Sequence, residues 1–193
     1  MRQTFCLVVP VLLGLAIAGT GGGNEPPKPD EKPKVFREQV QGQWRHPGEK
    51  LVRITGRVKV LDSHTLRFAD GTEVNINGRM DAPDLGQQGL IGNALYPCGK
   101  EAAAFLEKVI GDRPVTCYSD GAPIDAKQIN NADAFVGETN LAVEMVRNGW
   151  AMAQHSGMAG WEVIARDNNR GLWRGKFVFP EKWRKGERLP QEK

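Results

Sequence analysis

The sequence predicts a single α+β domain in which short strands are followed by helices. Between Val58 and Asp84, apolar and polar residues alternate in three short runs, as expected for half-buried strands. Asp70-Gly71 separates two of these runs, and this dipeptide is a strong signal for a tight hairpin turn. Further along, apolar residues recur at helical spacing, most clearly between Cys98 and Ile110. A chain of 193 residues has room for one such domain and its tails.

Glycines and loop segments separate the expected strands and helices. Strands are predicted over Leu51–Leu61, Thr65–Ala69, Glu73–Asn77, Arg113–Tyr118 and Ile129–Val136. Helices are predicted over Cys98–Ile110, Thr139–Asn148 and Gly160–Arg170, and a glycine follows each of them directly, as is common where a helix ends. The Gly/Gln-rich segment Gly86–Pro97 is expected to be a loop, and Trp161, Ile164 and Ala165 are expected to face inward.

The start of the chain has the features of a secretory signal peptide. Arg2 precedes an apolar run over residues 5–18, and the run ends in small residues suited to cleavage. We therefore expect residues 1–18 to be removed and the protein to be exported, to the periplasm or outside the cell, without a stable membrane anchor. The alternative is an uncleaved anchor, but the run contains Pro10 and is shorter than the roughly 20 residues that span a bilayer.

The remaining chain divides into three parts by composition. Residues 19–50 are expected to form a flexible linker and lead-in, because Gly, Pro and charged residues dominate their first half. Residues 51–173 form the predicted domain, and 174–193 form a basic C-terminal extension. The formal net charge of the chain is +3; residues 161–193 carry nine Lys/Arg against five Asp/Glu, a net +4. This mildly basic end is not charged strongly enough to indicate nucleic acid binding by itself.

Three aspartates mark the ends of the predicted strands. Asp62 lies in the turn after the first strand, whereas Asp81 and Asp84 lie in the sequence D-A-P-D that follows the third. We expect them to converge at one edge of the sheet, where carboxylate oxygens suit a hard cation such as Ca²⁺. The alternative is that they only form turns, which aspartate does without a metal.

Four segments together resemble the staphylococcal-nuclease-like (thermonuclease) family. They are V-N-I-N-G-R-M-D-A-P-D (74–84), C-G-K-E-A-A-A-F-L (98–106), M-V-R-N-G-W-A (145–151) and A-R-D-N-N-R-G-L-W-R-G-K-F (165–177). The resemblance covers about 56–183. It implies a β-barrel with helices, namely a five-stranded OB-fold of the staphylococcal nuclease type with about three helices. It also implies metal-dependent hydrolysis of phosphodiester bonds in DNA and RNA, with Ca²⁺ as the cofactor.

The cysteines are consistent with export. Cys6 leaves with the predicted signal peptide, so Cys98 and Cys117 remain as an even pair in a protein bound for an oxidising compartment. Exported members of the family often show such a pair. The resemblance therefore implies a disulfide between Cys98 and Cys117, which would join the first helix to the strand after it. The alternative is two buried thiols.

The resemblance assigns metal-binding roles around the acidic loop. Asp62 matches the first aspartate of the family's D-G-D-T turn, but His64 stands where the metal-binding second aspartate belongs. Imidazole is a poor ligand for Ca²⁺ and favours softer transition metals; the alternative is that His64 is an exposed turn residue. Asp81 matches the other metal-binding aspartate, and the carbonyl of Ala82 matches a further ligand.

The catalytic positions depart further from the family's pattern. Asp84 replaces the glutamate that positions or deprotonates the attacking water. Asn75 and Ile129 stand where the family has two arginines, which grip the phosphate and stabilise the charge of the transition state. Arg79 and Lys127 are the candidates to replace them, although neither reproduces a planar bidentate clamp at the original place.

The sequence leaves three functions open. The favoured one is an exported thermonuclease-like domain with weak or no catalytic activity, which keeps its barrel to bind single-stranded DNA or RNA, or another protein. The second is an active nuclease with a site rebuilt from Asp81, Asp84, Arg79 and Lys127, and with a transition metal at His64. The third is a structural exported domain without affinity for nucleic acid.

Overall fold

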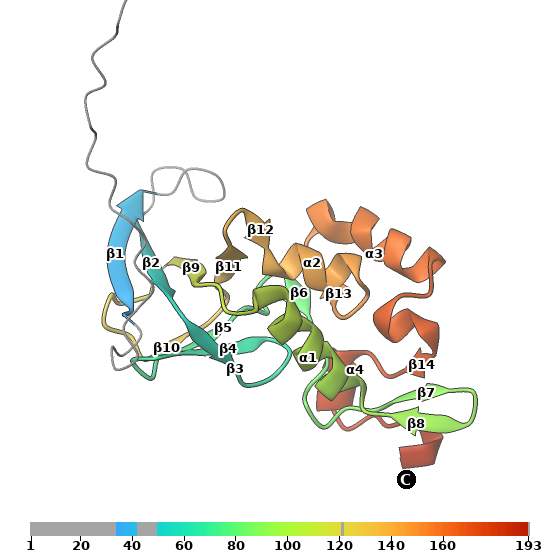
Figure 1. The fold of residues 1–193 in the computed structure, drawn as a ribbon. Coiled ribbons are helices and arrows are strands. Elements are labelled where there is room, and N and C mark those ends of the chain that lie inside the picture. The colour runs from blue at the N-terminus through green and yellow to red at the C-terminus, as the bar shows by residue number, and fades with distance from the viewer. Residues whose placement is uncertain (1–33, 42–49, 121, 193) are drawn as a thin grey trace, which may run out of the picture. The chain divides into compact units, whose positions relative to one another are not determined.

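The structure, a computed structural model, describes residues 34–41, 50–120 and 122–192 (Figure 1). All of them belong to one compact unit, Lys32–Lys193. The predicted signal peptide, Cys6 and most of the predicted linker lie outside the described residues. Within those residues, strands and helices combine as the sequence predicts, so the α+β class is confirmed. None of the described helices is both long enough and apolar enough to cross a membrane.

The largest sheet is antiparallel and contains five strands. Its order is β1-β2-β9-β11-β12, with β1 at Phe36–Gln41, β2 at Lys50–Gly56, β9 at Val115–Asp120, β11 at Asp133–Val136 and β12 at Thr139–Asn140. Every second residue of β9 and β11 is buried, so one face of the sheet covers the core. Strand β1 lies in the segment predicted to be a linker and lead-in, and it pairs with β2 along its whole length.

The second sheet contains the hairpin that the sequence predicts. Its order is β10-β5-β4-β3, with β3 at Val58–Val60, β4 at Thr65–Phe68, β5 at Glu73–Asn75 and β10 at Gln128–Ile129. The turn between β4 and β5 lies at Asp70-Gly71, where Gly71 has a φ of 85°, a conformation that favours glycine. The pair β10–β5 is parallel, whereas the other two pairs are antiparallel.

The two sheets are connected through two bent strands. Only Arg57 separates β2 from β3, and only residues 130–132 separate β10 from β11. Each of these two stretches therefore contributes to both sheets. None of the sheets formed by the described strands closes on itself as a barrel.

The structure contains two smaller sheets, and the one formed by β7, β8 and β14 corrects the prediction of a loop over Gly86–Pro97. A short pair joins β6 (Met80–Asp81) to β13 (Met152–Ala153). In the other sheet, β7 (Gly89–Ile91) and β8 (Ala94–Tyr96) form a hairpin, and β14 (Lys176–Phe177) adds to its outer edge (Figure 1). Local composition indicated a loop because the segment is rich in glycine, but the C-terminal strand supplies a partner from far along the chain.

The predicted helices are confirmed with small shifts of their ends. Helix α1 spans Cys98–Ile110, α2 spans Leu141–Arg147 and α3 spans Ala159–Asp167. A further helix, α4 at Pro180–Arg184, lies in the C-terminal segment. Three short 3₁₀ helices occur at Ser156–Met158, Gly171–Arg174 and Pro190–Glu192.

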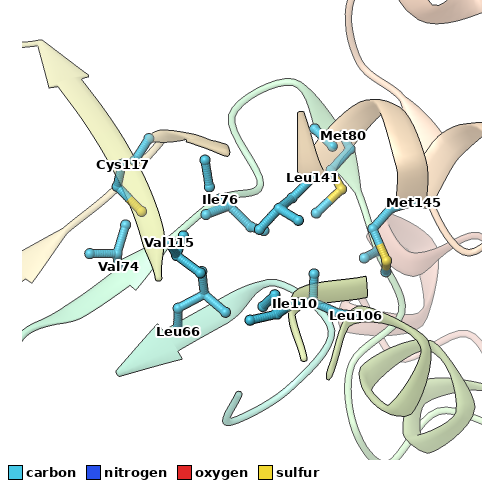
Figure 2. Packing of buried hydrophobic residues seen from close by; sticks show 14 of the residues in the cluster. Leu66, Val74, Ile76, Met80, Leu106, Ile110, Val115, Cys117, Leu141 and Met145 are labelled. Carbon is cyan, nitrogen blue, oxygen red and sulfur yellow. The ribbon is translucent and has the colours of Figure 1, made fainter. Parts of the chain in front are cut away.

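Helices and strands share one hydrophobic core. Figure 2 shows apolar side chains from β4, β5, β9, α1 and α2 pointing toward one another. Fully buried members of this cluster include Leu66, Val74, Val115, Leu106, Leu141 and Met145. For the third helix the prediction is confirmed for Ala165, which is buried, and wrong for Trp161 and Ile164, which are 39% and 41% exposed.

The expected disulfide is absent, and Cys98 and Cys117 are free, buried thiols. Cys98 begins α1, packs beside Tyr96 and Leu172, and donates a hydrogen bond to the carbonyl of Gln87 at 3.3 Å. Cys117 lies on β9 and faces the main core. The two thiols therefore belong to separate hydrophobic clusters. Burial raises the pKa of Cys98 to about 12 and also raises the pKa of Cys117.

The predicted basic extension folds back onto the β7–β8 hairpin. Val178 and Leu189 pack against Leu90 in a small cluster, with Trp183 partly buried against it. The Nε2 of buried Gln87 donates a hydrogen bond to the carbonyl of Val178 at 2.5 Å. These contacts bring α4 close to the loop that contains Asp81 and Asp84.

Candidate functional site

The acidic loop Asp81–Asp84 is held between a strand pair and a helix. Asp81 ends β6 and is paired with Met152 of β13. On the other side, a Cβ at Gly99 would collide with the carbonyl oxygen of Asp84, so the first turn of α1 lies directly against the loop. Only glycine permits this close approach. The position of the loop therefore depends on the β6–β13 pair and on α1 together.

The carboxylate of Asp81 is almost fully enclosed and has several hydrogen-bond donors. Its side chain is only 8% exposed. Oδ1 lies 2.5 Å from the guanidinium of Arg184 and 3.5 Å from Nδ2 of Asn77. Oδ2 accepts a hydrogen bond from the backbone N–H of Glu181 at 3.1 Å. Both carboxylate oxygens are thus engaged, chiefly by groups on α4.

Arg184 also binds the second carboxylate of the loop. Its other terminal nitrogen lies 3.0 Å from Oδ2 of Asp84. Burial acts to lower the pKa of Arg184, but the hydrogen bonds and charges of Asp81 and Asp84 outweigh it and raise that pKa above its usual value. Arg184 therefore stays charged and neutralises part of the charge of the loop. Sequence reasoning missed this residue, because the partners are about 100 positions apart and no local pattern connects them.

The turn with Asp62 and His64 does lie beside the acidic loop, as predicted, but Ser63 makes the connection. The hydroxyl of Ser63 donates a hydrogen bond to the carbonyl of Pro83 at 2.5 Å. Oδ1 of Asp62 accepts from the backbone N–H of His64 at 2.9 Å, which closes the turn. The Nδ1 of His64 lies 3.2 Å from the Ser63 hydroxyl and 3.5 Å from Asp62. Asp62 and His64 thus interact with their own turn.

The two predicted substitutes for the family's arginines have other partners. The Nε of Arg79 lies 2.7 Å from a carboxylate oxygen of Asp133. The Nζ of Lys127 donates to the carbonyl of Asp70 at 3.2 Å, at the turn between β4 and β5. In this conformation neither head group is paired with Asp81 or Asp84, whose cationic partner is Arg184.

The two positions that the resemblance assigns to arginines have structural roles. The side chain of Asn75 accepts a hydrogen bond from the backbone N–H of Asn77 at 2.9 Å. Ile129 is 3% exposed and is paired with Val74 across the parallel strands. A buried isoleucine leaves no space for a charged side chain that reaches a phosphate.

A polar cavity of about 410 Å³ opens beside Arg184. Amide side chains line much of it, together with the charged residues of the loop and of α4. Its walls are formed by Asn77, Gly78, Met80, Asp81, Asn131, Gln154, Glu181 and Arg184. Amides provide both hydrogen-bond donors and acceptors, so the cavity suits a polar ligand.

The residues in this arrangement do not fit a resident Ca²⁺. Arg184 already binds one carboxylate oxygen of Asp81 and one of Asp84, and Asp62 is bonded to its own turn. Within the part of the chain that the structure describes, no group of three or more His, Cys, Asp or Glu side chains is arranged to hold a metal ion. The guanidinium is the cation that this loop binds.

In comparisons with known proteins, no family model matched this chain and no curated protein matched it.

Proposed function

We propose that the domain is an OB-fold of the thermonuclease type that binds single-stranded nucleic acid and has weak or no nuclease activity. The observation that carries the second half of this proposal is the double ion pair of Arg184 with Asp81 and Asp84. A guanidinium on these carboxylates competes with the metal ion that the family's chemistry needs. Export by a signal peptide over residues 1–18 is part of the proposal and lies outside the described residues.

The order of strand pairing supports the OB-fold. If β2–β3 and β10–β11 each count as one bent strand, the pairs are β3–β4, β4–β5, β5–β10, β11–β9 and β9–β2. This series returns to the strand where it began, with five strands in all. The parallel pair β5–β10 joins the third strand to the fifth, and α1 lies between the third and fourth strands in the chain. Such an arrangement suits a small five-stranded barrel.

The loss of catalytic groups supports binding without efficient cleavage. A phosphate clamp contributes by stabilising charge that develops in the transition state, and removing one such group typically lowers the rate on the order of 10²–10³-fold. Asn75 and Ile129 cannot supply this charge, and Arg79 is paired with Asp133. Phosphodiester hydrolysis by the family's route is therefore expected to be slow.

The polar cavity supports nucleic acid as the ligand. Unpaired bases are recognised by hydrogen bonds to their edges, for which the amides of Asn77, Asn131 and Gln154 are suitable. Several arginines of the strands and their connections are paired with acids, as in Arg67–Glu73 and Arg79–Asp133. Binding through bases rather than through many phosphates implies a shallow dependence of affinity on salt.

A second candidate is an active nuclease with a rebuilt site. The observation that favours it is that an arginine does lie beside both acidic residues, although it is Arg184 rather than Arg79 or Lys127. In this alternative Asp84 acts on the attacking water and Arg184 leaves the carboxylates to hold the phosphate. Cleavage would then require both Asp81 and a divalent cation.

A digestion assay distinguishes the two candidates. Single-stranded DNA and RNA are incubated with the protein in EDTA, Ca²⁺, Mg²⁺, Mn²⁺ or Zn²⁺, beside Asp81→Ala and Asp112→Ala variants. Asp112 is an exposed matched control, just beyond the far end of α1 and about 20 Å along that helix from the loop. We expect the wild-type protein to cleave no more than Asp81→Ala does. We also expect it to bind labelled oligonucleotides, which fluorescence anisotropy measures. Metal-dependent cleavage that Asp81→Ala abolishes and Asp112→Ala keeps would establish the active nuclease. The absence of binding at low salt would instead favour a structural domain without affinity for nucleic acid.

A further inference from the structure

The acidic loop and the C-terminal segment show an arrangement that the family resemblance does not explain. The carboxylates that would hold a metal ion are instead bound by a side chain of the same chain. We propose that α4 is an autoinhibitory latch, which closes the candidate site by inserting Arg184 between Asp81 and Asp84. Its effect on nucleic acid binding rests on the proposed function, whereas its opening and closing do not.

The segment that carries α4 is anchored on both sides of the helix. Before it, β14 pairs with β7, and Val178 packs in the small cluster with Leu90. After it, Leu189 packs in the same cluster. The segment can therefore stay attached to the domain while the helix between its anchors moves.

The helix itself has few contacts besides those with the acidic loop. Pro180 is the only one of its residues that is buried, and Trp183 is partly buried against the Leu90 cluster. The polar contacts that join α4 to the loop are the two ion pairs of Arg184 and the hydrogen bond from the N–H of Glu181 to Asp81. Because Asp81 is only 8% exposed, its charge needs these partners, and the closed position is favoured.

Closure by α4 limits what can enter the site. Glu181 and Arg184 form part of the wall of the 410 Å³ cavity. When α4 moves away, that wall opens, and the engaged oxygens of Asp81 and Asp84 become available to another cation or donor. A ligand that needs the open site binds with an apparent affinity reduced by the small fraction of open molecules.

Hydrogen exchange of backbone amides tests whether the latch opens when Arg184 is removed. The full chain is compared with Arg184→Gln and with Lys182→Gln, which removes the same charge from an exposed position of α4. We expect amides of 181–186, including Glu181, to exchange at least tenfold faster in Arg184→Gln, while α1 and Lys182→Gln keep wild-type rates. Unchanged exchange in Arg184→Gln overturns the latch, and so does equal acceleration in α1, which would indicate general destabilisation.

Asp84→Asn provides a second variant in case Arg184→Gln does not fold. It removes one of the two ion pairs and leaves Asp81 paired with Arg184. We expect a smaller acceleration, of about threefold, confined to α4. The absence of any change in this variant would count against the latch in the same way.

Binding of a fluorescein-labelled single-stranded oligodeoxynucleotide tests what the latch does. Arg184→Gln and Lys182→Gln carry the same net charge, so general electrostatic attraction is matched. A latch predicts that Arg184→Gln binds at least tenfold more tightly than Lys182→Gln. Weaker binding would show that Arg184 holds the ligand and would overturn autoinhibition. If none of the proteins binds, the proposed function fails, and the exchange measurement alone decides the latch.

Discussion

The hydroxyl of Ser63 donates a hydrogen bond of 2.5 Å to the backbone carbonyl of Pro83, and both residues are buried. This bond joins the turn after β3 to the acidic loop after β6. It therefore sets the distance between the residues that the sequence singled out, Asp62 and His64 on one side and Asp81 and Asp84 on the other.

Replacing Ser63 with alanine is expected to lower the free energy of unfolding by about 1–3 kcal/mol, because the buried carbonyl of Pro83 loses its donor. Urea unfolding measures the change. Ser156→Ala, at an exposed position, should stay within about 0.5 kcal/mol of the wild type. Equal effects of both substitutions would show that the Ser63 bond has no special role.

A double-mutant cycle should measure the coupling of Asp81 with Arg184. Because the carboxylate is enclosed and the bond is between charged groups, the coupling between Asp81→Asn and Arg184→Gln is expected to be about 1–2 kcal/mol in the free energy of unfolding. The pair Glu181–Lys185, which is solvent-exposed, serves as the comparison and should give a much smaller coupling. Additive effects at Asp81 and Arg184 would be inconsistent with the geometry described.

Gly99→Ala should displace the acidic loop. The new Cβ would collide with the carbonyl oxygen of Asp84, so either α1 or the loop must move, at a cost of about 1–3 kcal/mol or more in stability. Gly160 of α3 is the matched control, since a Cβ there meets no atom within 4 Å and alanine favours a helix. Thermal unfolding of both variants checks the prediction, which fails if Gly99→Ala is as stable as Gly160→Ala.

The two thiols are expected to be unreactive in the folded protein. In a Cys6→Ser background, Ellman's reagent at pH 8 should modify neither Cys98 nor Cys117 until urea is added, because burial raises both pKa values. Unfolded thiols ionise near pH 9, so stability should be constant below that pH and should fall as the pH rises above it. A chain that shows no free thiol in urea without reductant would contain the disulfide instead.

Asp70 should make stability depend on pH in acid. Burial acts to raise its pKa, but the N–H of Thr72 and the guanidinium of Arg37 together lower it from 3.8 to about 2. A lowered pKa means that the contribution of Asp70 is fully present above about pH 4 and is lost as the pH falls toward 2. Unfolding free energies of Asp70→Asn should therefore depend less on pH in this range than those of the wild type, while Asp112→Asn, at an exposed position, should follow the wild type.

Local patterns were sufficient for most strands and helices. Alternation predicted β4 and β5, and helical spacing with a following glycine predicted α1 over the residues that it occupies. These patterns succeed because each reports which side chains of one element face the core. They failed for α3, where Trp161 and Ile164 are exposed, because apolar spacing does not show how much of a helix face the rest of the chain covers.

The sequence by itself determined the α+β class, the hairpin at Asp70-Gly71 and the place of the acidic loop after a strand, because these depend on residues close together in the chain. Only the tertiary structure decided that β14 pairs with β7, that Cys98 and Cys117 face different clusters, and that Arg184 lies between Asp81 and Asp84. These contacts join segments that are far apart in the chain. Their formation depends on the path of the folded backbone, which no local pattern of residues reports.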